Sequence, residues 1–101
     1  FADEVAERMA TLGVSPVGTP GDLVAKRSWE DYSVGRADTT VHLEAINKVY
    51  DGVIEDHRAA IAKAGELDPV TEDLLIGQTA ELEKFQWFVR AHLENSKGDI
   101  K

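Results

Sequence analysis

The chain has 101 residues, a length that suits one domain with a modest core. Its net charge of −8 argues against an intrinsic nucleic-acid-binding face and favours solubility or the attraction of cations. Cysteine is absent, which excludes disulfides and thiolate metal sites, and no apolar run approaches the length of about 18 residues that predicts a membrane span.

The first predicted element is a helix over residues 1–12, which Gly13 ends from the C′ position. Glu4 and Arg8 are spaced for an exposed i, i+4 ion pair. The apolar stripe of this helix follows the i, i+4, i+7 spacing of a buried face and consists of Val5, Met9 and Leu12. Because the helical pattern begins without a cap, we expect the sequence to be part of a longer chain.

The next segment, from about residue 13 to 32, predicts an unusually long connection. Its first part, Val14–Gly21, contains two prolines and two glycines, which is typical of a loop. Residues Asp22–Ser28 can form a two-turn helix within it. We expect a connection of this length to cross the end or side of the molecule.

A long helix follows, beginning at about Ser33 or Asp38 and running to Ala64, with Gly65 as its end. Its apolar positions recur with helical spacing, and they are Val41, Ala45, Ile46, Val49, Tyr50, Val53, Ile54 and Ile61. No segment of the chain has the alternating pattern of a strand. The sequence therefore predicts an all-α fold.

The last predicted helix has the clearest start, with Asp68 as N-cap and Pro69 at the first helical position, and it runs to about Asn95. The short turn makes the two long helices antiparallel neighbours. Phe85 and Trp87 differ by about 200° around the last helix, so apolar side chains lie on more than one side. Another helix or a neighbouring subunit must cover the remaining surface.

Asp3 and Glu7 form the most informative pair of residues. Their i, i+4 spacing places both carboxylates on one face of the first helix, one turn apart. Such a pair can bind one metal ion or two neighbouring ions. Taken alone, such a pair is more often a solvated helix face, and the spacing leaves both interpretations open.

The segments Asp3–Gly13 and Glu81–Phe88 resemble the Dps family, the DNA-binding proteins from starved cells or miniferritins. Details in 29–32 and 85–94 resemble actinobacterial members, and the resemblance covers essentially all 101 residues. It implies that residues 1–101 are the C-terminal part of a single ferritin-like four-helix-bundle domain. The sequence would then hold the end of the second bundle helix, a short connecting helix, and the third and fourth helices.

The resemblance also implies a function. Family members are bacterial cytoplasmic proteins, in some cases nucleoid-associated, that form a hollow homo-oligomer of twelve subunits built from dimers. They oxidise Fe(II), preferentially with hydrogen peroxide, and store the ferric mineral, which protects DNA. Asp3 and Glu7 match the Asp and Glu that act as catalytic iron ligands in the ferroxidase site. Two histidines and an acid from the first helix of another subunit complete that site, and that helix is absent from this sequence.

Further acidic residues match the pore through which iron enters the shell. Asp73 and Glu72 fall where the family has acidic three-fold pores, where a ring of carboxylates concentrates Fe(II). The same acids can simply be favourable charges at a helix N-terminus. His42, His57 and His92 lie on separate turns without carboxylates at ligand spacing, which favours surface or interface roles.

DNA is a weakly supported partner. Family members that bind DNA commonly use a tail rich in lysine and arginine. Here residues 95–101 contain two lysines and an aspartate. The alternative function is a non-enzymatic shell protein, either structural or DNA-compacting, whose ferroxidase site is lost or incomplete.

Overall fold

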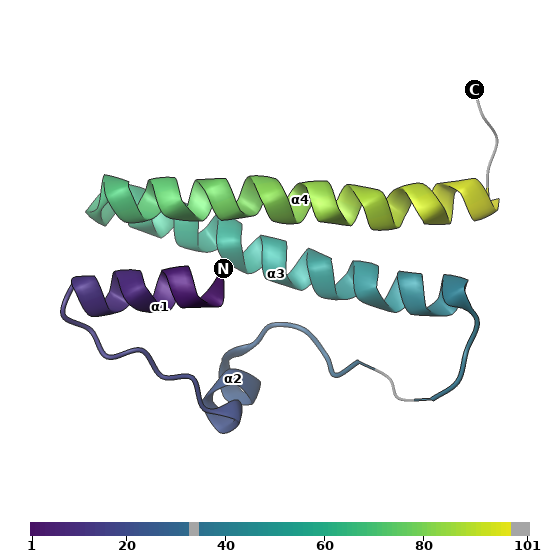
Figure 1. The fold of residues 1–101 in the computed structure, drawn as a ribbon, viewed down its shortest axis with the longest axis horizontal. Helices are drawn as coiled ribbons and strands as arrows, with labels where there is room; N and C mark the ends of the chain where they lie inside the picture. Colours follow the sequence, from purple (N-terminus) through teal and green to yellow (C-terminus); the bar gives the residue numbers. More distant parts are fainter. Residues whose placement is uncertain (33–34, 98–101) are drawn as a thin grey trace.

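The structure is a computed structural model that describes residues 1–32 and 35–97 (Figure 1). Within these ranges the chain forms helices and no strands, which confirms the predicted all-α class. The helices are α1 (Ala2–Thr11), α2 (Pro20–Lys26), α3 (Thr39–Leu67) and α4 (Pro69–Lys97). No helix in the described part of the chain is both long enough and apolar enough to cross a bilayer.

Helices α3 and α4 form an antiparallel hairpin and lie side by side (Figure 1). Asp68 alone separates them. Its N–H donates to the carbonyl of Ala64 at 2.7 Å, while its carboxylate accepts the N–H of Val70 at 3.2 Å. The predicted start of the last helix, with Asp68 as cap and Pro69 as first residue, is confirmed.

Gly65 does not end α3, contrary to the prediction, because the helix continues to Leu67. Gly65 does not take the positive φ of a C′ glycine, whereas Gly13 does, with φ of 86° just after α1. A Cβ atom at Gly65 would lie 2.1 Å from Oε2 of Glu72. The glycine therefore serves the close approach of a side chain from α4.

Other boundaries differ by one or two residues from the expected ones. Helix α2 begins two residues early, because Thr19 caps it and accepts the N–H of Asp22 at 3.4 Å. Helix α3 begins at Thr39, after Asp38 accepts the N–H of Val41 at 3.1 Å. The alternative start at Ser33 lies outside the described residues, as do positions 98–101 of the C-terminal tail.

The most buried side chains belong to α4 and face the other helices. Leu75 is the one large apolar side chain that is buried among the described residues, and it is joined there by polar Gln78, Thr79 and Gln86. Many large apolar side chains remain exposed, including Phe85 at 38% and Trp87 at 53%. These exposed residues agree with the prediction that the hairpin cannot cover its own apolar surface.

The packing of Gly52 against Trp29 can be tested by mutation. A Cβ atom there would lie 3.0 Å from Cβ of Trp29, so alanine must displace Trp29 and the connection that carries it. Overpacking costs about 1–3 kcal/mol, and the better helix propensity of alanine recovers about 1 kcal/mol. With Trp87→Phe as background, we expect Gly52→Ala to lower the free energy of unfolding and shift Trp29 fluorescence to longer wavelength.

Gly77→Ala in the same background is the matched control, because no atom lies within 4 Å of the added Cβ. It should leave the emission unchanged and stabilise the helix by up to about 1 kcal/mol. An unaltered Trp29 spectrum in Gly52→Ala would contradict the packing described here.

Candidate functional site

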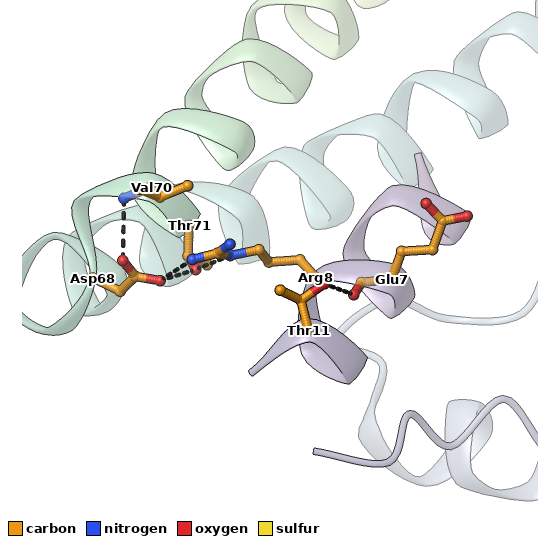
Figure 2. Close-up of polar contacts among 6 residues, drawn as sticks. All are labelled: Glu7, Arg8, Thr11, Asp68, Val70 and Thr71. Carbon is orange, nitrogen blue, oxygen red and sulfur yellow. Dashed lines mark hydrogen bonds and ion pairs between the residues drawn. The ribbon is translucent and has the colours of Figure 1, made fainter. Parts of the chain in front are cut away.

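Asp3 and Glu7 lie one turn apart on α1, and both side chains are exposed. Neither carboxylate has a hydrogen bond or ion pair with any described residue. Figure 2 shows the side chain of Glu7 directed away from the contact that Arg8 makes with the hairpin. The predicted pair is therefore present on one helix face, with its oxygens available to a cation.

Contrary to the prediction from sequence, Arg8 does not pair with Glu4. Its Nη2 instead donates to Oδ2 of Asp68 at 2.7 Å, and its Nε donates to the hydroxyl of Thr71 at 3.0 Å (Figure 2). Arg8 reaches the α3–α4 turn, where two acceptors match the fixed directions of its donors. The Arg8 and Asp68 side chains are 21% and 29% exposed, so solvent screens this pair less than it would screen an i, i+4 surface pair.

The environment of Asp68 lowers its pKa to about 2. The largest cause is the hydroxyl of Thr71, which donates to Oδ2 at 2.6 Å. The hydrogen bond from Arg8 and the N–H of Val70 act in the same direction, and partial desolvation opposes them. All of these donors stabilise the ionised carboxylate.

Gln78 contacts α1 at a second point, the carbonyl of Phe1. This side chain is 4% exposed, and its Nε2 donates to the carbonyl of Phe1 at 3.1 Å. Its Oε1 lies 3.1 Å from Nε2 of His57, whose Nδ1 lies 3.2 Å from the carbonyl of Val53. One buried amide thus links α1, α3 and α4.

An open groove of about 830 Å³ runs along the inner side of α1. Val5 and Met9 of the predicted apolar stripe line it, opposite Trp29 and His57. Asp3 also belongs to its lining, whereas Glu7 does not. Asp3 therefore lies at the edge of a largely apolar groove.

The two predicted pore residues differ in their surroundings. Asp73 is exposed and lines a groove between α1 and α4 together with Glu4 and Arg8. Glu72 is partly buried, and its carboxylate lies over Gly65 of α3. The structure therefore does not bring Glu72 and Asp73 together as one pair of exposed ligands.

The three histidines all have hydrogen-bond partners. Nδ1 of His42 lies 2.7 Å from the hydroxyl of Tyr32, and Nδ1 of His92 lies 2.7 Å from the carbonyl of Phe88. Within residues 1–32 and 35–97, no group of three or more histidine, aspartate and glutamate residues is placed to hold a metal ion. Asp3 and Glu7 are thus two carboxylates, hard oxygen donors that need further ligands to hold a metal ion.

Thr71 and Gln78 are contact residues that the sequence reasoning missed. Gln78 carries a recognisable signal, since it lies three residues after Leu75 and four before Leu82, on a stripe that is otherwise apolar. A polar residue in that register predicts a buried hydrogen-bonding role. Thr71 carries a weaker signal, three residues after the capping Asp68.

A model of the ferritin-like domain family matches residues 1–98. The DNA protection during starvation protein of Mycolicibacterium smegmatis is 59% identical over 100 residues, covering 99% of this chain and 55% of the relative. The chain spans about half the length of the curated relatives it matches.

Solved structures agree with these matches. DpsA14 from Streptomyces coelicolor superposes with a TM-score of 0.88 at 61% identity, covering 99% of this chain and 60% of that one. Dps from Staphylococcus aureus superposes at 0.81 with 26% identity, covering 90% and 61%. The similarity extends along this whole chain and includes both long helices.

The lowered pKa of Asp68 predicts a pH dependence of stability. A depressed carboxyl pKa stabilises the fold above the ordinary value of 3.8, and this contribution is lost as the pH falls toward about 2. We expect wild type to be more stable than Asp68→Asn at pH 5, with the difference shrinking between pH 4 and pH 2. Urea unfolding at a series of pH values measures this difference in the free energy of unfolding, and Glu81→Gln serves as the control variant. A difference that stays constant across that range would contradict the assignment.

Proposed function

This chain belongs to the Dps family of ferritin-like proteins, and on that premise we propose that it is part of an iron-oxidising, iron-storing subunit in which Asp3 and Glu7 bind Fe(II). The supporting observation is that two exposed carboxylates share a face of α1 and make no hydrogen bond or ion pair with the described residues. A carboxylate held in an internal ion pair would bind a cation less readily.

The chemistry of the pair fits Fe(II) as a substrate. Two Fe(II) ions each lose one electron, and hydrogen peroxide accepts both electrons and two protons to give two molecules of water. Asp3 and Glu7 favour the more highly charged product, because anionic oxygen ligands stabilise Fe(III) more than Fe(II). Consuming peroxide in this two-electron reaction avoids the release of hydroxyl radicals, and we propose it as the preferred oxidant.

The remaining ligands would come from outside these 101 residues. Following the family resemblance, we propose two histidines and an acid from the first helix of a partner subunit, across a two-fold interface. Residues 1–101 would form the C-terminal part of one ferritin-like domain, in a shell of twelve subunits that stores the ferric mineral. The apolar groove beside α1 and the exposed Trp87 support burial of this surface against additional protein.

Several relatives are named for DNA protection during starvation. We propose that this protein protects DNA in the bacterial cytoplasm by removing Fe(II) and peroxide. The net charge of −8 on these 101 residues gives little electrostatic attraction to phosphates, and the proposal does not require DNA binding.

The first experiment measures Fe(II) oxidation by the full-length assembled protein. We expect Asp3→Ala combined with Glu7→Ala to lower the initial rate with hydrogen peroxide at least tenfold, because the site loses two of its five proposed protein ligands. Glu4→Ala, which removes a neighbouring exposed carboxylate of α1, is the matched control and should retain the rate. An unchanged rate in the double variant would instead favour a non-enzymatic shell protein.

A second experiment concerns iron entry, for which we propose Asp73 as the main pore carboxylate and Glu72 as a secondary one. Asp73 is the more exposed of the two, so neutralising it should weaken the local attraction of Fe(II) more. We expect Asp73→Asn to raise the KM for Fe(II) severalfold at low ionic strength with little change in kcat, and Glu72→Gln to have a smaller effect. Equal kinetics for Asp73→Asn and wild type would remove this residue from the pathway.

A further inference from the structure

Helix α1 carries both proposed iron ligands, yet none of its side chains is buried in this chain. Polar contacts with α4 and the turn before it hold this helix at two points. Arg8 binds Asp68 and Thr71, and about two turns earlier the carbonyl of Phe1 accepts Gln78. Within the described residues, directional contacts therefore fix the position of α1.

We propose that Arg8, Asp68 and Gln78 are positioning residues that set the rotation and height of α1, and thereby place Asp3 and Glu7 for iron. This inference rests on the proposed function and assigns no direct contact with iron to any of the three residues. Asp68 and Gln78 act from α4 and the turn before it, through the helix that they hold.

The rotation of α1 follows from the spacing of its residues. Consecutive side chains diverge by about 100° around a helix, so Glu7 points about 100° from Arg8, and Asp3 points about 140° from it. Fixing Arg8 against the α3–α4 turn therefore turns both carboxylates away from α4. Figure 2 shows this divergence for Arg8 and Glu7.

The anchor at the turn is itself rigid. Oδ1 of Asp68 accepts from Val70, and its Oδ2 accepts from Thr71 and Arg8, so the backbone and a second side chain orient the acceptor. The guanidinium uses two separate donors on two acceptors. Lysine keeps the positive charge but lacks the two fixed donors of the guanidinium. Arg8→Lys therefore keeps the electrostatic attraction to Asp68 and removes the directional hydrogen bonds.

Gln78 fixes the height of α1 at a second point, the carbonyl of Phe1. The carbonyl of Phe1 accepts both the N–H of Val5, within the helix, and Nε2 of Gln78. The amide cannot rotate freely, because Oε1 also contacts His57. The two anchors, at Phe1 and Arg8, are about two turns apart along the helix and restrain both tilt and sliding. Sites of this kind tolerate displacements of only about 0.5 Å.

The test uses the full-length assembled protein and Co²⁺ as a spectroscopic substitute for Fe(II). We expect Arg8→Lys and Asp68→Asn each to weaken Co²⁺ affinity about tenfold, alter the Co²⁺ absorption spectrum and raise the KM for Fe(II), with a smaller change in kcat. Thermal unfolding and gel filtration confirm that each variant assembles. If Arg8→Lys fails to assemble, Asp68→Asn alone provides the test, because it keeps the size and capping ability of the side chain.

Arg58→Lys is the matched control. Arg58 also binds a carboxylate through a fork, donating to Glu83 at 2.7 and 2.9 Å, but it joins α3 to α4 and does not touch α1. Equal losses of Co²⁺ affinity in Arg8→Lys and Arg58→Lys would indicate general destabilisation and overturn the positioning role.

The remaining outcomes separate this inference from the proposed function. If the anchor variants bind Co²⁺ like wild type while Asp3→Ala with Glu7→Ala does not, the positioning role is wrong and the iron site stands. If that double variant also binds like wild type, both proposals fail.

Discussion

Asp68 makes the contacts on which the arrangement of the three longer helices depends. Its backbone ends α3, its carboxylate caps α4, and the same carboxylate receives Arg8 from α1. The hairpin turn and the attachment of the ligand-bearing helix therefore share one ionised group. Donors surround it on several sides, which explains why its pKa falls well below the ordinary value.

The most buried positions of the α3–α4 hairpin hold polar side chains, although such positions are usually apolar. Gln78, Thr79 and Gln86 occupy its most buried positions, and each makes hydrogen bonds there. Large apolar side chains lie toward the outside instead, among them Trp87 and Phe88. This distribution suits a subunit whose apolar surface is completed by other protein, as proposed for the shell.

The local features of the fold could be predicted from sequence because short-range rules decide them. The Asp68–Pro69 start, the positive φ of Gly13 and the face shared by Asp3 and Glu7 each depend on residues within a turn of one another. The partner of Arg8 could not be found this way, since Glu4 fits the local rule and Asp68 lies 60 residues away. The role of Gly65 could not be predicted for a related reason, because it depends on Glu72 in the next helix.

The connectivity of the helices also indicates the order in which they assemble. Helices α3 and α4 meet across a single residue, so their pairing closes a minimal loop, whereas α1 must be brought back across 60 residues to reach Asp68. We expect the hairpin to form first and α1 to dock late. Within the described residues, polar contacts from Asp68 and Gln78 hold α1 to the hairpin. The proposed iron ligands thus lie on a helix that docks onto an already formed hairpin, and a bound ion would stabilise the docked helix by mass action.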